Sequence, residues 1–184
     1  MEKKPTLLQF TMTYGAILGI VSIIFSIILY ITGYIPYNFK RMALTSVIGI
    51  GIMIVFLVMG SKAYRDKVLD GTISYYKALV LGMMIVVFAT ILSGFYSLIF
   101  NLFIDPEYSD KVFEATKSWM YDYLNNMGVP DASIEQSMDR IEKQQAAYTP
   151  MKAFFQSIFY SFIVGFVLSL ITSAFVKKNP NPVA

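Results

Sequence analysis

The sequence predicts an all-α, polytopic membrane protein with four transmembrane helices and an extracytoplasmic helical hairpin between the third and the fourth. Of its 184 residues, 56% are hydrophobic and only 15% are charged, which is typical of membrane proteins. Four uncharged stretches are long enough to cross a bilayer, which takes about 20 apolar residues. A long polar segment with helical periodicity separates the last two stretches. We therefore interpret residues 1–184 as a single membrane domain.

The four predicted spans run approximately over residues 10–33, 44–61, 78–104 and 153–176. The second span is the shortest and the third is the longest, so helix tilt or fraying has to absorb the difference. A basic start followed by an apolar run also resembles a secretory signal, but this run is too long and no small-residue cleavage site follows Tyr30. We therefore expect the first stretch to remain as an uncleaved span.

The polar segment between the last two spans predicts a helical hairpin over about residues 109–149. Its first half has apolar residues at steps of three and four, and it ends where Gly128 can take a left-handed cap. The second helix is expected to begin with Asp131 or Ser133 as its N-cap. The apolar face either packs within the hairpin, which we favour, or binds a partner. The region around Trp119 could equally rest on lipid headgroups.

The basic residues predict how the chain is oriented in the membrane. Eight of them lie on one side of the predicted spans: Lys3, Lys4, Lys62, Arg65, Lys67, Lys77, Lys177 and Lys178. The other side has Lys40 and Arg41 in a short loop, and a long segment, residues 105–152, in which nine acidic residues outnumber five basic ones. Because loops rich in lysine and arginine stay in the cytoplasm, both termini are predicted to be cytoplasmic and the hairpin to face outward.

Several classes of catalytic and transport site have no counterpart in the sequence. The absence of cysteine and histidine removes thiolate chemistry, the commonest general base and the commonest metal ligand. The predicted spans also lack the ionisable residues that normally mark ion paths through a membrane. Asp105, Glu107 and Asp110 could hold a divalent cation, but a turn at Asp105 and a helix cap at Asp110 explain them more economically. We expect no enzyme activity, cofactor or metal.

The most regular signal is a row of small residues at every fourth position of the fourth span: Ser157, Ser161, Gly165, Ser169 and Ser173. The first span offers a matching face, made of Gly15, Gly19, Ser22 and Ser26. Because small residues let helices approach closely in a bilayer, we interpret both rows as helix-packing surfaces in preference to a ligand groove. The basic residues Lys62, Arg65 and Lys67 could contact anionic lipid, although retention of their loop in the cytoplasm also explains them.

Two stretches around the third span carry a resemblance to a known family. The span is entered through YRDKVLDGTISYYKALVLGMMI and left through NLFIDPEY. With the order of the spans, these stretches resemble the four-span membrane proteins grouped as domain of unknown function 4199, found mainly in Bacteroidota. Where the family carries F-x-x-A before this span, the chain has Tyr75, Tyr76, Lys77 and Ala78. The resemblance implies a bacterial inner membrane protein and supplies no catalytic residue, because the family has no established activity.

These observations favour an integral accessory or interaction subunit that packs on a membrane protein partner or on a second copy through its small-residue faces. The alternative is a partner of an envelope glycosyltransferase that handles a lipid or a polyprenyl phosphate through the basic loop. A small carrier or channel ranks lowest, because the spans lack ionisable residues. Membrane lipids are expected contacts under every hypothesis, and no nucleic acid is expected.

Overall fold

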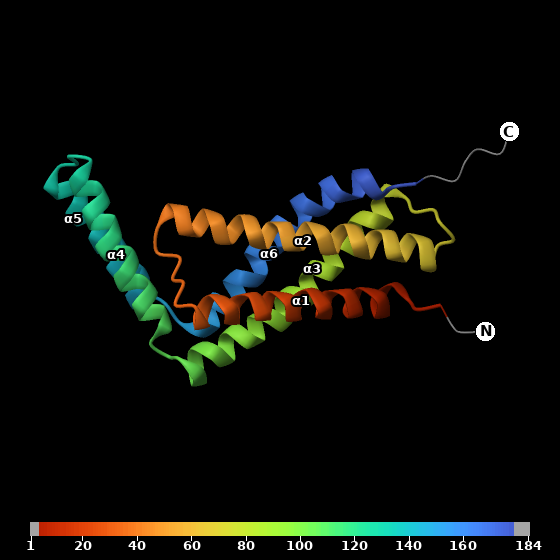
Figure 1. Cartoon of the computed structure of the whole chain (residues 1–184), viewed down its shortest axis with the longest axis horizontal. Coiled ribbons are helices and arrows are strands. Elements are labelled where there is room, and N and C mark those ends of the chain that lie inside the picture. Colours follow the sequence, from red (N-terminus) through yellow and green to blue (C-terminus); the bar gives the residue numbers. More distant parts are fainter. Residues whose placement is uncertain (1–3, 179–184) are drawn as a thin grey trace.

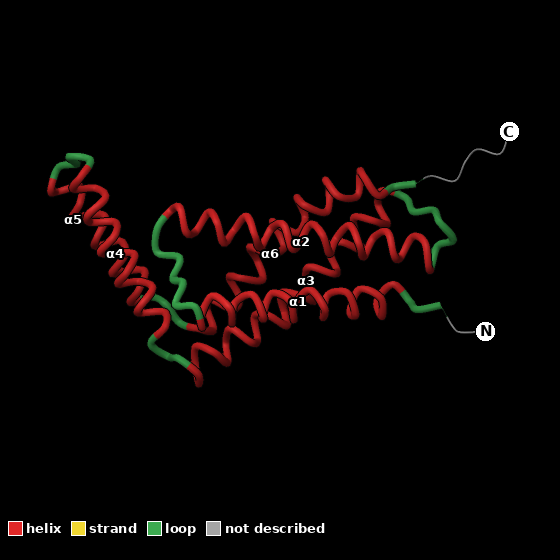
Figure 2. Tube along the Cα trace, in the orientation of Figure 1, coloured by secondary structure: helices red, strands yellow, loops and turns green. Residues whose placement is uncertain are grey.

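The computed structural model describes residues 4–178, which form six α-helices joined by short connections (Figures 1 and 2). In chain order the elements are α1 (Leu7–Ile31), α2 (Phe39–Lys67), α3 (Tyr75–Ile99) with its π-helical continuation η1 (Phe100–Ile104), α4 (Tyr108–Asn126), α5 (Asp131–Ala146) and α6 (Pro150–Val176). Four helices, namely α1, α2, α3 with η1, and α6, are long and apolar enough to cross a membrane. The predicted fold class, an all-α multi-pass membrane protein, is confirmed.

All four long helices begin before the uncharged stretches from which their limits were predicted, and α2 also ends beyond its stretch. The second span was predicted over residues 44–61, whereas α2 runs from Phe39 to Lys67. Its two ends therefore include six charged residues: Lys40, Arg41, Lys62, Arg65, Asp66 and Lys67. Charged side chains end an apolar stretch without ending a helix, because they have high helix propensity and can lie in the interfacial layer. The membrane-spanning helices are thus longer than their apolar centres.

Side-chain caps begin four of the helices. Thr6 and Gln9 form a capping box before α1, in which each side chain accepts a hydrogen bond from the other residue's backbone N–H. The side chain of Asn38 accepts from the backbone of Arg41 at the start of α2, at 2.8 Å. Ser74 and Thr149 cap α3 and α6 in the same way. Each cap satisfies a backbone donor that the first turn of a helix leaves free.

The turn of the hairpin matches the prediction in part. Gly128 has φ +69°, the predicted left-handed conformation, and Pro130 follows it. The predicted N-caps are wrong, because α5 begins at Asp131 with Pro130 in the cap position and without a side-chain cap. The carbonyl of Pro130 instead accepts from Ser133 and Ile134. Asp110, predicted to cap the first helix, lies inside α4 and accepts a hydrogen bond from Gln145, which ties the two hairpin helices together.

The four long helices form an elongated bundle with two different ends (Figure 1). The start of α1, the α2–α3 loop and the end of α6 lie together at what we call the basic end. The hairpin of α4 and α5 leans away from the opposite end, the hairpin end. At the basic end, backbone hydrogen bonds of 3.0 Å run in both directions between Ile73 and Lys178, and Lys4 pairs with Asp70 at 2.7 Å. The last span is thereby fixed to the α2–α3 loop.

The bundle is centred on α3. Of the apolar stretch of α3 with η1, 44% is buried, against 6% for α2. Both α1 and α6 make their most extensive contacts with α3, whereas α2 is buried only towards the basic end, at Leu57, Gly60, Ser61 and Tyr64. The half of α2 nearest the hairpin therefore leaves a gap beside a tightly packed group of three helices.

The hairpin packs on itself and is fastened to the bundle. Between its helices, Lys117 forms an ion pair with Glu142, and Ile134 is buried. The rings of Trp119 and Phe39, the first residue of α2, meet at 4.9 Å between centroids. The region of Trp119 thus contacts the start of the chain's own second span, and its contact with lipid headgroups stays a prediction.

Candidate functional site

The predicted small-residue face of α1 divides between a helix contact and an open surface. A methyl group added at Gly15 would lie 2.5 Å from Cβ of Phe88 and 2.9 Å from the carbonyl oxygen of Ile85, both on α3. At Gly19 it would lie 3.1 Å from the carbonyl oxygen of Ala89. Ser22 is half-buried and Ser26 is exposed. Gly15 and Gly19 therefore lie directly against the backbone of α3, and the face opens beyond them.

The row on α6 also lies against α3. A methyl group at Gly165 would lie 2.7 Å from Cγ1 of Val86, and Oγ of Ser169 lies 2.6 Å from where a Cβ of Gly82 would be. Ser173 is buried, whereas Ser157 and Ser161 are half-buried. The expected pairing of the fourth span with the first is wrong, because α3 lies between them and takes both rows on different faces.

The sequence of α3 also contains a row of small residues, which the prediction did not recognise as the surface that contacts α6. Buried residues recur on α3 at every fourth position, and most of them are small: Ala78, Gly82, Val86, Thr90 and Gly94. This row receives α6, since Gly82 and Val86 meet Ser169 and Gly165. The hydroxyls of Ser169 and Ser173 have no hydrogen-bond partner among the described residues, so these two serines contribute small volume to a close contact.

A groove opens where α2 separates from the other three spans, and we call it the α2 groove. It is a cavity of about 410 Å³. Its lining combines apolar side chains with small and hydroxyl-bearing residues, and it has no ionisable member: Leu18, Ser22, Phe25, Ser46, Gly49, Ile50, Ile52, Met53, Val86, Ala89, Thr90, Ser93, Ser161 and Val164. Ser22 and Ser161 belong to the predicted packing rows, so parts of these rows line a cavity.

Two of the five hydroxyl groups that line the α2 groove, those of Ser22 and Ser93, form hydrogen bonds within their own helices. The hydroxyl of Ser22 donates to the carbonyl of Leu18 at 2.9 Å, and that of Ser93 donates to the carbonyl of Thr90 at 3.4 Å. Hydroxyls that bond back to their own helix can still accept a hydrogen bond, but they present little polarity to a neighbour. The groove therefore suits an apolar chain, and it offers no charge to an ion.

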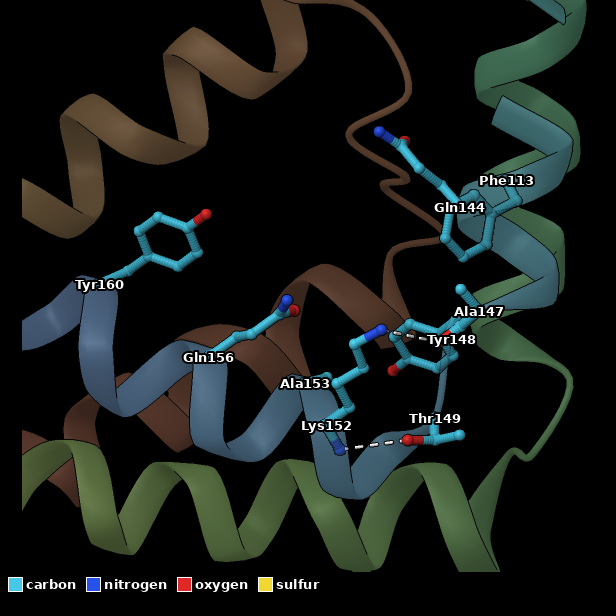
Figure 3. A pocket seen from close by; sticks show the side chains of 9 residues that line it. All are labelled: Phe113, Gln144, Ala147, Tyr148, Thr149, Lys152, Ala153, Gln156 and Tyr160. Carbon is cyan, nitrogen blue, oxygen red and sulfur yellow. Dashed lines mark hydrogen bonds between the residues drawn. The ribbon is translucent and has the colours of Figure 1, made fainter. Parts of the chain in front are cut away.

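A second cavity, the junction pocket, lies where the hairpin returns to α6 (Figure 3). Its volume is about 350 Å³, and its lining is polar and aromatic: Phe113, Gln144, Ala147, Tyr148, Thr149, Lys152, Ala153, Gln156 and Tyr160. A third cavity of about 290 Å³ lies between α3 and α6. It shares Ala153 with the junction pocket and Thr90, Ser93 and Ser161 with the α2 groove. The three cavities are thus neighbours along one side of α6.

A cluster of polar side chains joins the hairpin to α1 and α3 at the hairpin end of the bundle. The carboxylate of Asp105 accepts from Lys111 at 3.1 Å and from the hydroxyl of Tyr30 at 3.3 Å. The hydrogen bond from Lys111 to Asp105 raises the pKa of Lys111, and burial raises the pKa of Tyr108 beside it. Asp105, considered above for cation binding, is therefore held by side chains of the chain itself. These contacts connect the hairpin to the bundle.

The three basic residues predicted to contact lipid have different surroundings. Arg65 pairs with Asp66 at 2.7 Å and donates to the carbonyl of Val176 at the end of α6, at 3.2 Å. Lys62 and Lys67 are exposed. Arg65 therefore holds the basic end together, and only Lys62 and Lys67 present free surface for an anionic headgroup.

Comparison with known proteins gives one match. The model of the family described as "Protein of unknown function (DUF4199)" matches residues 13–178 of the chain. No curated protein and no solved structure matches it.

Proposed function

We propose that this chain, which belongs to the DUF4199 family of proteins of unknown function, is a membrane accessory protein that holds the apolar chain of a lipid in the α2 groove. The resemblance drawn from the sequence is confirmed at the level of the family. The observation that carries the proposal is the departure of α2 from α3 towards the hairpin end, which leaves an uncharged cavity at the depth of the apolar stretches.

The lining of the α2 groove favours the apolar chain of a lipid. No ionisable residue of the described part of the chain borders the groove, and most of its lining side chains are apolar or small. A flexible hydrocarbon chain can follow such a cavity. The volume is also within the range of ligand sites, about 300 to 1,000 Å³.

A pair of glycines on α2 provides the test and its control. A side chain at Gly49 or at Gly51 would meet nothing within 4 Å, so both positions tolerate bulk. Only Gly49 lines the groove, and two residues along a helix point about 200° apart. We expect Gly49→Phe to lower the amount of lipid that copurifies in nanodiscs, measured by mass spectrometry, and Gly51→Phe to retain it. Equal retention by both variants would contradict the proposal.

The interaction role predicted from the small-residue rows is the second candidate. The contacts of Gly15 and Gly165 lie within the chain, so another protein would have to pack on the exposed apolar surface of the bundle, for example on the side of α2 where Val47 is 68% exposed. Because the chain has no cysteine, Val47→Cys gives a unique reporter. A cross-linked second copy or partner in native membranes supports this role, and a monomeric product opposes it.

We further infer that the protein resides in a bacterial inner membrane with both termini in the cytoplasm. The clustering of Lys4, Lys62, Lys67 and Lys177 at the basic end supports this orientation, as does the acidic hairpin at the other end. Reporter fusions check it: one after Asp70 should report the cytoplasm and one inserted at Gly128 the opposite side. A periplasmic signal at Asp70 would reverse the arrangement.

A further inference from the structure

The junction pocket has the chemistry of an anion site. Lys152 is the single charged residue among those that line it, and the described residues include no ion pair of Lys152. Its ammonium group makes one long contact, 3.5 Å to the carbonyl of Ala147, out of three possible donor contacts. Two side-chain amides, those of Gln144 and Gln156, line the same space. A negatively charged group would therefore find one uncompensated cation and neutral donors.

The arrangement of the lining follows the axis of α6. Figure 3 shows Lys152, Gln156 and Tyr160 extending from one side of α6 into the same space. They are spaced four residues apart, which places them one above another at steps of about 6 Å. The charged member is nearest the hairpin, and Tyr160 is nearest the middle of the span. The polarity thus decreases from the membrane interface inward, as it does from the headgroup to the chain of a lipid.

The junction pocket lies near the site of the proposed lipid chain. It shares Ala153 with the cavity between α3 and α6, and that cavity shares Ser161 with the α2 groove. Ser161 follows Ala153 by two turns on α6, about 12 Å. The three cavities therefore follow one another along α6. An amphipathic molecule lying along this helix would have its polar end at Lys152 and its apolar end towards the α2 groove.

We propose that the junction pocket binds the phosphate-bearing headgroup of a membrane lipid, with Lys152 as the anion ligand and the amides of Gln144 and Gln156 as additional donors. This inference rests on the proposed function, because the chain of the same lipid would occupy the α2 groove. Phosphate suits the pocket because it accepts several hydrogen bonds at once and carries a negative charge, which would give the Lys152 ammonium group an ion-pair partner. We assign the phosphate to a lipid because Lys152 lies in the first turn of a membrane-spanning helix and the neighbouring cavities border the same helix farther along its apolar part.

The test compares the retention of added phosphatidylglycerol and of added diacylglycerol by the protein purified in a detergent that contains no phosphate, measured by mass spectrometry. Lys152→Gln should lower the retention of phosphatidylglycerol on the order of tenfold, the loss of one charged hydrogen bond, and leave that of diacylglycerol unchanged. Lys152→Arg should restore retention. Lys40→Gln serves as the matched control, since Lys40 is an exposed cation near the same end of the bundle that does not line the pocket.

Each other outcome has a separate meaning. If Lys152→Gln and Lys40→Gln lower the retention equally, the effect is general surface charge and the headgroup site is wrong. If Lys152→Gln has no effect while Gly49→Phe reduces the retention of both lipids, the headgroup site is wrong and the proposed function stands. If Gly49→Phe reduces neither, the proposed function fails. Displacement of phosphatidylglycerol by inorganic phosphate would assign the site to a free anion and overturn the lipid source.

Discussion

Glycine has opposite roles in the two regions of this bundle. In the group formed by α1, α3 and α6, a methyl group on Gly15 or Gly165 would lie within 3 Å of α3. On the half of α2 nearest the hairpin, the same change at Gly49 or Gly51 would meet nothing within 4 Å. In one region the missing side chain permits two helices to touch, and in the other it leaves room beside a helix. A small residue in a span therefore indicates space, and only its surroundings decide whether a helix or a ligand fills it.

The largest effect is expected from Gly15→Leu. The added side chain meets the backbone carbonyl of Ile85 as well as Cβ of Phe88, and backbone cannot turn away as a side chain can. We expect a loss of about 3 kcal/mol or more, at the upper limit of overpacked cores. Thermal unfolding in nanodiscs measures it, with Gly51→Leu as the control in an open position. Equal unfolding temperatures would remove the distinction between the two regions.

A smaller loss is expected from Gly165→Leu. Its obstacle is the side chain of Val86, 2.7 Å from the added methyl group, which is stiff but not part of the backbone. We expect about 1 to 3 kcal/mol from the same unfolding measurement. Because this contact joins α6 to α3, Val86→Ala in the same chain should recover part of the loss. A double variant as unstable as Gly165→Leu alone would mean that the clash lies elsewhere.

Lys111→Met tests whether the hairpin is held independently of the bundle. The change removes the cation beside Asp105 but touches no contact between the spans. Hydrogen exchange should become faster in α4 and stay unchanged in α3. The raised pKa of Lys111 means that its contribution is complete at neutral pH and is lost as the pH rises through that pKa, so wild type at strongly alkaline pH should resemble the variant. Unchanged exchange in α4 would show that the aromatic contacts suffice.

The smallest effects are expected from Ser161→Ala and Ser169→Ala. Alanine keeps the small volume, and the hydroxyl of Ser169 has no partner to lose among the described residues. Hydrogen bonds between membrane helices average about 0.6 kcal/mol, which sets the expected scale of the change. Unfolding temperatures close to wild type are therefore expected. If Ser161→Ala also lowers lipid retention strongly, its hydroxyl takes part in the α2 groove and the packing interpretation of that residue is wrong.

The sequence predicts the fold well because the fold depends on local properties. Apolar length gives the four spans, and the left-handed turn at Gly128 follows from its position before Pro130. Helix limits were less accurate, since the charged residues Lys62 and Arg65 continue α2 beyond its apolar part. The rows of small residues on α1 and α6 were recognised as packing surfaces, but their common partner, α3, was not. Gly15 and Gly165 would permit close contact with any neighbouring helix, so the sequence does not indicate which one they contact.

The candidate site was largely beyond the reach of the sequence. In the sequence, Gly49 resembles a helix-packing residue. It lines the groove only because α2 diverges from α3, and no sequence pattern predicts that two helices diverge. The junction pocket combines Phe113, Gln144 and Lys152, which come together only because the chain turns back at Pro150. Such sites depend on the relative placement of helices, and one sequence does not contain that placement.

The central position of α3 has a consequence for how the protein is made. The first two helices leave the ribosome before the helix on which α1 packs, and they share few contacts with each other. We expect α1 and α2 to wait in the bilayer as separate helices until α3 arrives, with lipid covering the glycines of α1. Synthesis then continues through the hairpin, which in the proposed orientation has to cross the membrane before α6 can dock on the other face of α3. A pause or truncation before residue 150 would therefore leave a half-built intermediate whose exposed face on α3 is ready for quality-control proteases.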